Sequence, residues 1–423
     1  MLSYIIQGKT KLQGKVEASG SKNAALPIIA TAILNPEPVT LYNIPNIEDT
    51  KITLEILKLL GCTVDNKNDK ITICSKNMNK TTIPKDLMHK LRSTVVLAGA
   101  IIGRFKEATF AFPGGCNIGA RPIDLHLDAF KKLGIDIEEE CDVISCKCKE
   151  IVGKRIKLKF PSVGATENII LASVYAKGAT HITNAAKEPE IKDLAKCLNC
   201  MGAKIYGAGT SEITIFGVKS LHKANYKIIS DRIETGTLLC ATAGTGGKIT
   251  VKGANPENLL TVLYSLKEAG CKVTINRNTI KLVAPKRLKA IKLATEPYPG
   301  FPTDMQPIMG AILTKAEGKS IIEENIFENR FKYAEELIRM GANIEENGKM
   351  LEITGVDTLY GKDVMSKDLR GGAALVIAGL MSEGETRVEN IEYILRGYEN
   401  LDEKLQKLGA NIKKRKGGIN AKV

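Results

Sequence analysis

One cysteine stands in a glycine-rich segment, residues 113–122, whose residue types could form a reactive loop. Three glycines surround Cys116 and allow backbone conformations that other residues avoid. Pro122 suits the first position of a helix, and Arg121 lies five residues beyond the thiol, where a cation favours the thiolate form. The pattern indicates either a movable loop with a reactive thiol or a tight turn around a packed cysteine.

Charged residues also recur at the starts of apolar segments. Six segments are rich in small and aliphatic residues, which predicts helices that are apolar on all sides and therefore buried. They cover residues 21–34, 92–102, 164–176, 231–243, 303–313 and 368–380. Aspartate suits the first turn of a helix, whereas lysine and arginine oppose the helix dipole there. Lys22, Arg92 and Arg370 at such positions indicate anion binding, and the alternative is an arginine that extends to solvent.

These helices belong to an internal repeat. A helix that ends on glycine and leads into a strand recurs six times, at Gly61, Gly134, Gly202, Gly270, Gly341 and Gly409. The spacing of about seventy residues is longer than that of common solenoid repeats, so each unit should be a small α/β module. We expect the glycine to adopt the left-handed conformation that ends a helix.

The repeat predicts two lobes, because 423 residues exceed what one hydrophobic core usually serves. The first lobe should comprise residues 20–229, with the cysteine loop. The second should comprise residues 1–19 plus 230–423, with the opening strand, residues 5–19, paired to later strands. Helix starts would then line a charged cleft that closes by hinge motion, with the cysteine loop as its lid.

Composition narrows the location and the partners. No apolar run approaches the ~18 residues of a membrane span, and the first residues lack the apolar core of a signal peptide, so we expect a cytoplasmic protein. The net charge of +14 comes from basic residues with few aromatic residues between them, because aromatic residues make up 5% of the chain and tryptophan is absent. We therefore expect small anionic substrates, no nucleic-acid or membrane partner, and a monomer.

The ten cysteines should be reduced in the cytoplasm. Cys141, Cys146 and Cys148 form one local set, and Cys197 and Cys200 form a C-x-x-C pair. A four-cysteine zinc site needs two such pairs on turns, whereas the flanks of this one predict an amphipathic helix with both thiols on its core face. We expect core packing and neither metal nor cofactor.

The chain resembles the enolpyruvyl transferases over essentially its whole length. The matching motifs are residues 19–24, 114–122, 162–167, 231–236, 301–304, 327–331, 368–370 and 396–398. The resemblance implies the family's inside-out α/β barrel, with two lobes each built from three βαβαββ-type repeats around buried helices. It also implies transfer of the enolpyruvyl group of phosphoenolpyruvate to the 3-hydroxyl of UDP-N-acetylglucosamine, with release of phosphate. That addition and elimination is the first committed step of peptidoglycan synthesis.

The resemblance assigns catalytic roles to four residues. Cys116 would protonate carbon 3 of phosphoenolpyruvate, and Asp304 would accept the hydroxyl proton. Lys22 and Arg396 would hold the phosphate, because fixed charges stabilise the charge that moves during reaction. The substrate-binding set would be Lys22, Asn23, Arg92, Arg121, Pro122, Ile123, Asp124, Leu125, Ser162, Val163, Gly164, Asp304, Ile326, Arg330, Asp368 and Arg370.

Several neighbours of this set keep two interpretations. Asp368 would steer departing groups or simply cap its helix. His126 would either pack in the protein interior or prepare Cys116 for reaction. Glu188 and Glu190 are interpreted as structural turn residues. Some family members carry a lysine at the position of Phe160, and we expect Lys159 to face the opposite side of a strand, which leaves fewer cations for the diphosphate.

Three other functions compete with this one. A shikimate 3-phosphate enolpyruvyl transferase shares the fold, but resemblance to that family does not account for the Gly-Gly-Cys loop, which is present here. An RNA-terminal phosphate cyclase-like protein would need a histidine in an active-site motif, and His89, His181 and His222 stand in none. A non-enzymatic regulatory copy is the third, and the presence of Cys116 and Asp304 argues against it.

Overall fold

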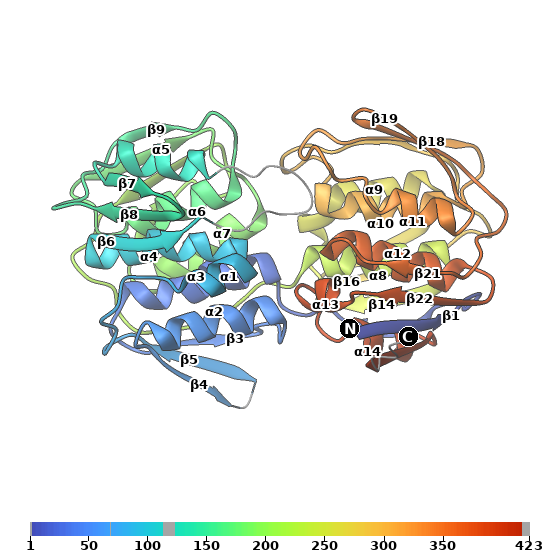
Figure 1. Cartoon of the computed structure of the whole chain (residues 1–423), viewed down its shortest axis with the longest axis horizontal. Helices are drawn as coiled ribbons and strands as arrows, with labels where there is room; N and C mark the ends of the chain where they lie inside the picture. Colours follow the sequence, from blue (N-terminus) through green and yellow to red (C-terminus); the bar gives the residue numbers. More distant parts are fainter. Residues whose placement is uncertain (1, 68, 113–122, 417–423) are drawn as a thin grey trace. The chain divides into compact units, whose positions relative to one another are not determined.

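The computed structural model describes residues 2–67, 69–112 and 123–416, so Cys116, Arg121 and Pro122 lie outside the described residues. The fold is α/β, and the described strands form five sheets of four strands and one of three (Figure 1). The described residues divide into two compact units. Unit 2 runs from Gly20 to Ile229, and unit 1 holds the residues up to Ser19 and from Ser230 onward.

Unit 2 contains three sheets, with strand orders β13-β3-β5-β4, β6-β8-β7 and β11-β12-β10-β9. Its helices are α1 (Lys22–Thr31), η1 (Ala32–Leu34), α2 (Glu48–Leu59), α3 (Lys85–Lys90), η2 (Arg92–Val95), α4 (Val96–Phe105), α5 (Asp124–Lys132), α6 (Val163–Ser173) and α7 (Pro189–Cys200). Its strands are β3 (Val39–Tyr42), β4 (Thr63–Lys67), β5 (Lys70–Cys74), β6 (Glu107–Ala111), β7 (Asp136–Glu140), β8 (Val143–Lys147), β9 (Arg155–Lys157), β10 (Ala179–Thr183), β11 (Lys204–Tyr206), β12 (Glu212–Phe216) and β13 (Ala224–Lys227).

Unit 1 also contains three sheets, with strand orders β21-β22-β1-β23, β15-β16-β14-β2 and β17-β18-β20-β19. Its helices are α8 (Arg232–Gly244), η3 (Pro256–Leu259), α9 (Leu260–Glu268), η4 (Thr303–Met305), α10 (Gln306–Leu313), α11 (Ala334–Arg339), α12 (Leu369–Met381), α13 (Glu392–Leu395) and α14 (Leu401–Lys407). Its strands are β1 (Leu2–Gln7), β2 (Gln13–Glu17), β14 (Lys248–Lys252), β15 (Lys272–Asn276), β16 (Thr279–Val283), β17 (Lys292–Ala294), β18 (Lys319–Glu323), β19 (Asn343–Asn347), β20 (Met350–Thr354), β21 (Asp363–Met365), β22 (Glu385–Glu389) and β23 (Asn411–Lys416).

The six predicted apolar helices are confirmed as α1, α4, α6, α8, α10 and α12, three of them extended by a short 3-10 turn. They lie in the cores of their units, as their uniformly apolar sequences require. In α12, every residue from Arg370 to Met381 is buried. Helices α4 and α6 pack together in unit 2, and α10 packs on α12 in unit 1.

The opening segment pairs with strands from the far end of the chain. Strand β1 lies antiparallel between β22 and β23, and Figure 1 shows it beside β22. Strand β2 runs parallel to β14. Tyr4 and Ile6 are buried, which is what an alternating strand with one core-facing side provides. The prediction that the opening segment pairs with the later residues is therefore confirmed, but the single strand expected over residues 5–19 is wrong, because β1 and β2 are separate strands in two different sheets.

The six repeat glycines all adopt positive φ, between 83° at Gly134 and 103° at Gly61. A side chain is strained in that region, so glycine is what ends each helix and turns the chain into the next strand. This prediction, made from the recurring pattern of helix, glycine and strand, is confirmed.

The prediction for the C-x-x-C pair is correct for one thiol and wrong for the other. Both cysteines lie on α7, as expected, and Cys197 is buried. Cys200 is exposed, because it is the last residue of the helix and lies about 60° around the axis from Cys197. Within the described ranges, no group of three or more His, Cys, Asp or Glu side chains could hold a metal ion. None of the helices in those ranges is long and apolar enough to cross a membrane.

Candidate functional site

A cluster of two arginines around one carboxylate lies in unit 1. Asp304 sits in η4, the short turn that leads into α10. Its Oδ1 accepts a hydrogen bond from Arg330 Nη2 at 2.9 Å, and its Oδ2 accepts from Arg370 Nε and Nη2 at 3.2 and 3.0 Å. The arginine side chains are 2% exposed, whereas that of Asp304 is 29% exposed. The carboxylate is thus held from within the protein and open on its outer side; we call these three residues the Asp304 cluster.

Arg370 is the most deeply embedded member of the Asp304 cluster. Its guanidinium lies 5.0 Å from the centre of the Tyr398 ring, and the Tyr398 hydroxyl lies 2.9 Å from Thr237 Oγ1 on α8. Burial lowers the pKa of Arg370, but Tyr398 and Asp304 outweigh this and raise it above its ordinary value. Its Nη1 is buried and makes no hydrogen bond to the described residues. A permanent cation with one unused donor group is therefore fixed at this site.

Asp368 caps α12, in line with the simpler of its two interpretations. Its Oδ1 accepts from the backbone N–H groups of Arg370 and Gly371 at 2.9 and 3.0 Å. The same oxygen lies 3.9 Å from Arg330 Nη1, so the cap also faces the cluster. Capping fixes the first turn of α12 and hence the direction of the Arg370 side chain.

Glu324 organises the neighbouring loop, and no sequence motif marks it. The side chain is buried, and its Oε1 accepts from the backbone N–H groups of Ile326 and Phe327 at 2.9 and 3.1 Å. Its Oε2 accepts from Thr303 Oγ1 at 3.0 Å, next to Asp304 in the chain. One carboxylate therefore ties the predicted site residue Ile326 to the turn that carries Asp304.

Two further charged positions of unit 1 flank helix ends. Asp231 caps α8 by accepting from Ile233 N–H at 2.7 Å, and Arg232 stacks 5.6 Å from the Tyr298 ring centre. Arg396, predicted to hold phosphate, is half-buried at the end of α13, two residues before Tyr398 of the Arg370 contact. The structure thus brings Asp304, Arg330, Arg370 and Asp368 into direct contact and places Arg396 on a separate element.

In unit 2, the predicted phosphate ligand Lys22 begins helix α1. The helix is capped by Ser21, whose Oγ accepts from Ala24 N–H at 3.3 Å. Lys22 Nζ lies 2.8 Å from Asp49 Oδ2, with side-chain exposures of 12% and 0%. Asp49 was missed in the sequence because its partner is 27 residues away and on another helix. Asn23 follows Lys22 and is half-buried in the same first turn.

Asn168 joins the elements that carry three predicted substrate segments of unit 2. This residue lies on α6, the helix capped by Ser162 and begun by Val163 and Gly164. Its side chain bonds to η2 and α4 on one side and to His126 of α5 on the other. The three segments are η2 with Arg92, the turn into α5 with Ile123, Asp124 and Leu125, and the first turn of α6.

Among the turn residues, Ile123 is buried, Leu125 is half-buried and Asp124 is exposed. His126, for which packing and poising of Cys116 were both open, is buried between α5 and α6. Its Nδ1 lies 2.7 Å from Asn168 Nδ2, which shows the packing role. The poising role concerns Cys116, which lies outside the described residues.

Two expectations around the first turn of α6 are wrong. Lys159 lies in a bend after β9 rather than on a strand, because the chain turns at Phe160 and Pro161 toward the helix. Glu188 and Glu190 are not turn residues: Glu188 is at the N-cap position of α7, and Glu190 is in its first turn and buried. Acidic residues favour that position because they complement the helix dipole.

Glu167, on α6, adds a third carboxyl to this region. Burial raises its pKa well above the ordinary value, and the negative charges of Glu190 and Glu188 raise it further. A carboxyl in that setting keeps its proton to higher pH than it would in the unfolded chain. The start of α6 therefore differs from the Asp304 cluster, where one carboxylate lies between two cations.

The buried cysteines among the described residues are poor nucleophiles. Burial raises the pKa of Cys62 to about 11 and the pKa of Cys146, Cys197 and Cys271 to about 12. A thiol with so high a pKa is almost entirely protonated at neutral pH. Cys141 and Cys200 are the exposed thiols among the described residues.

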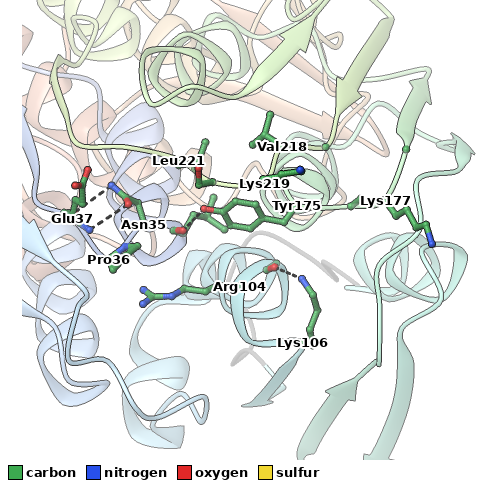
Figure 2. A pocket seen from close by; sticks show the side chains of 16 residues that line it. Asn35, Pro36, Glu37, Arg104, Lys106, Tyr175, Lys177, Val218, Lys219 and Leu221 are labelled. Atoms are coloured by element: carbon green, nitrogen blue, oxygen red, sulfur yellow. Dashed lines mark hydrogen bonds between the residues drawn. The ribbon is translucent and has the colours of Figure 1, made fainter.

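A surface hollow of unit 2 lies elsewhere. A groove of about 890 Å³ is bounded by the ends of η1 and α4 and by the segments that follow α6 and β12. Figure 2 shows Arg104, Lys106, Lys177 and Lys219 around it, with Tyr175 at its centre. Arg104 Nη1 donates to the Ile33 carbonyl at 2.8 Å, and Lys106 Nζ donates to the Gly103 carbonyl at 2.5 Å.

These two bonds satisfy carbonyls at helix C-termini, where cations complement the dipole. The groove therefore lies at the opposite ends of α4 and α6 from the predicted substrate segments, and its cations have a structural explanation. We name it the helix-end groove.

The comparisons with known proteins agree over the whole chain. The family model described as EPSP synthase (3-phosphoshikimate 1-carboxyvinyltransferase) matches residues 6–405. UDP-N-acetylglucosamine 1-carboxyvinyltransferase 2 of Caldanaerobacter subterraneus subsp. tengcongensis is 50% identical, covering 97% of this chain and 99% of the relative. UDP-N-acetylglucosamine 1-carboxyvinyltransferase 1 of Carboxydothermus hydrogenoformans is 47% identical over 99% of both chains.

Solved structures show the same fold at lower identity. The enolpyruvyl transferase NikO from Streptomyces tendae superposes with a TM-score of 0.89 at 24% identity, covering 99% of each chain. An EPSP synthase from Acinetobacter baumannii gives a TM-score of 0.75 at 17% identity, covering 98% of this chain and 100% of that one. These two matches support the α/β fold.

Proposed function

The chain belongs to the EPSP synthase family of carboxyvinyltransferases, and from that membership we propose its reaction. It transfers the enolpyruvyl group of phosphoenolpyruvate to the 3-hydroxyl of UDP-N-acetylglucosamine and releases phosphate, as a step of peptidoglycan synthesis. Relatives with 50% and 47% identity carry the name of this activity. The structural observation that carries the proposal is the Asp304 cluster.

In the proposed reaction, Asp304 accepts the proton of the attacking hydroxyl. A general base must be reachable from outside and fixed in direction, and the partly exposed carboxylate held on both oxygens by buried arginines meets both needs. The new C2–O bond forms while carbon 3 gains a proton. In the second step carbon 3 loses a proton and the C2–O bond to phosphate breaks.

The charges of phosphoenolpyruvate need fixed cations. Arg370 supports this role through its buried Nη1, which has no hydrogen-bond partner among the described residues. Lys22 and Arg396 would bind the phosphate, together with Arg121, and Arg330 would act through Asp304, which it contacts. Cys116 would donate the proton to carbon 3, as the family resemblance implies. Preorganised charges of this kind are often the largest single contribution to catalysis.

The nucleotide sugar is assigned to the three segments of unit 2 whose elements Asn168 joins, with Asn23 and Ile326 as further contacts. We also propose the finer description of the fold, an inside-out α/β barrel with lobes of residues 20–229 and residues 1–19 plus 230–423. The buried helices flanked by open sheets support it. A cytoplasmic monomer remains part of the proposal.

A phosphate-release assay tests the function. Phosphate should appear only when phosphoenolpyruvate and UDP-N-acetylglucosamine are both present, and Asp304→Asn should lower kcat by about 10²-fold or more. Asp357→Asn is the matched control, because Asp357 pairs with Arg287 on the surface. Release with shikimate 3-phosphate as acceptor, and none with the nucleotide sugar, would reject the proposal.

The thiol of Cys116 can be tested separately with an epoxide phosphonate such as fosfomycin. We expect alkylation of Cys116 alone, because most of the other thiols are buried and protonated. Peptide mass mapping identifies the alkylated cysteine, with Cys141→Ser and Cys200→Ser as controls. An adduct on either exposed cysteine, with Cys116 unmodified, would contradict the assignment.

A further inference from the structure

Asn168 makes a hydrogen-bond clamp that the proposed reaction does not use directly. The residue is fully buried on α6. Its Oδ1 accepts from the backbone N–H of Gly99 at 2.8 Å, and its Nδ2 donates to the carbonyl of Val95 at 3.1 Å. The same Nδ2 lies 2.7 Å from His126 Nδ1 on α5. One amide thus joins three elements of unit 2; Asn168 and His126 are the clamp.

The direction of the bond to His126 is fixed by the two backbone partners. A backbone N–H can only donate and a carbonyl can only accept, so the Asn168 amide cannot be reversed without the loss of two buried hydrogen bonds. Its second amide hydrogen is then left for His126 Nδ1, which must accept. A histidine that accepts on Nδ1 is neutral and carries its hydrogen on Nε2.

Two glycines provide the room for the clamp. A Cβ added at Gly99 would lie 2.4 Å from Asn168 Oδ1, and one at Gly164 would lie 2.8 Å from His126 Cε1 and 3.2 Å from Nε2. The distances of 2.4 and 2.8 Å are too short for a real Cβ atom. Gly164 belongs to the first turn of α6, so the imidazole is seated directly against a predicted nucleotide-sugar segment.

We propose that His126 and Asn168 are positioning residues for the nucleotide sugar. The clamp holds η2, the start of α5 and the first turn of α6 in one arrangement, and His126 presents its Nε2 edge to that turn. This inference rests on the proposed function.

Steady-state kinetics of the full chain test the positioning role. His126→Leu removes the acceptor and should raise KM for UDP-N-acetylglucosamine about tenfold, because one buried hydrogen bond is lost and its donor is left unsatisfied. KM for phosphoenolpyruvate and kcat should change less than about threefold. His126→Asn places an oxygen near the Nδ1 position and should restore most of the affinity. His181→Asn, on strand β10, is the control and should change nothing.

An equal rise in both KM values, or a loss of kcat at unchanged KM, would overturn the positioning role. Nuclear magnetic resonance of the unmodified protein gives a readout that does not depend on activity. The chain has four histidines, and the His126 signals are those that disappear in His126→Asn. We expect the ¹⁵N shifts of a neutral ring with hydrogen on Nε2, and a hydrogen on Nδ1 would overturn the clamp. Absence of turnover in the unmodified protein would reject the proposed function instead, and the ring state would still be measured.

Discussion

The Asp304 cluster of unit 1 and the helix-end groove of unit 2 are both rich in cations, yet they solve opposite electrostatic problems. In the cluster, Arg370 stands in the first turn of α12, where the helix dipole opposes a positive charge. In the groove, Arg104 stands in the last turn of α4, where the dipole favours one. The first cation needs a carboxylate, whereas the second needs only backbone carbonyls.

The partners in the structure follow this difference. Arg370 is paired with Asp304 at 3.0 Å, and Lys22 at the start of α1 is paired with Asp49 at 2.8 Å. Arg104 and Lys106 instead donate to main-chain carbonyls and to Ser75 Oγ. A pair of a cation and a carboxylate is costly to bury, and the helix dipole adds to the cost when the cation stands at a helix start. Such a pair therefore indicates function more strongly than the number of cations in a region does.

The largest expected effect comes from Arg370→Met. The change removes the donors to Asp304 Oδ2 and leaves Arg330 as its remaining ligand in the cluster, so kcat should fall by about 10²-fold or more. Arg370→Lys keeps the charge without the planar fork, so its kcat should lie between that of the unmodified protein and that of Arg370→Met. Phosphate release measures kcat, and urea unfolding shows whether each variant is folded. A folded Arg370→Met with normal kcat would make the cluster a structural feature like the groove.

Asp49→Asn should produce the second largest effect. Lys22 would keep its buried position but lose its carboxylate, which should destabilise the fold by about 2 kcal/mol and lower kcat/KM by about tenfold. The control is Asp65→Asn, whose partner Lys67 is on the surface and should contribute less than about 1 kcal/mol. Urea denaturation compares the two variants, and equal effects would contradict the assignment of a special role to buried pairs at helix starts.

The elements of the fold could be predicted from the sequence because their signals are local. Glycine spacing identified six helix ends, and uniformly apolar segments identified six buried helices. The pairing of β1 was also anticipated, since an extra strand before the first repeat needs a partner. The prediction that Cys200 faces the core was wrong, because the core face of a helix ends before its last residue.

The partners within the site could not be predicted, because they join residues far apart in the chain. Asp304 and Arg370 are 66 residues apart, and Asn168 and His126 are 42 apart. Glu324 and Asp49 have no motif of their own, and their importance comes from what they contact. Lys22 was predicted as a charged group in a first turn, whereas Asp49, which holds it, is a carboxylate on another helix.

A smaller effect is expected from Glu167→Gln, at the helix start where carboxyls gather. Since burial and the neighbouring Glu190 and Glu188 raise the pKa of Glu167 in the folded state, its contribution to stability is complete at low pH and is lost as pH rises through that pKa. Glutamine removes this loss. The variant should therefore resist urea better than the parent at pH 8 and equally at pH 4.5. Exposed Glu212→Gln is the control. Destabilisation of Glu167→Gln at pH 8 would show that an ionised Glu167 is paired.

The smallest effect on activity should come from the helix-end groove. Arg104→Gln removes donors to the Ile33 carbonyl and Ser75, which should cost about 1–2 kcal/mol of stability, because partly buried acceptors lose their partner. Because its cations are explained by helix carbonyls, kcat and both KM values should stay within about twofold. Lys219→Gln, on the groove wall, should change neither stability nor kinetics. If either variant altered kcat while remaining folded, cations aligned with a helix dipole would also contribute to function, and the electrostatic distinction between the two regions would fail.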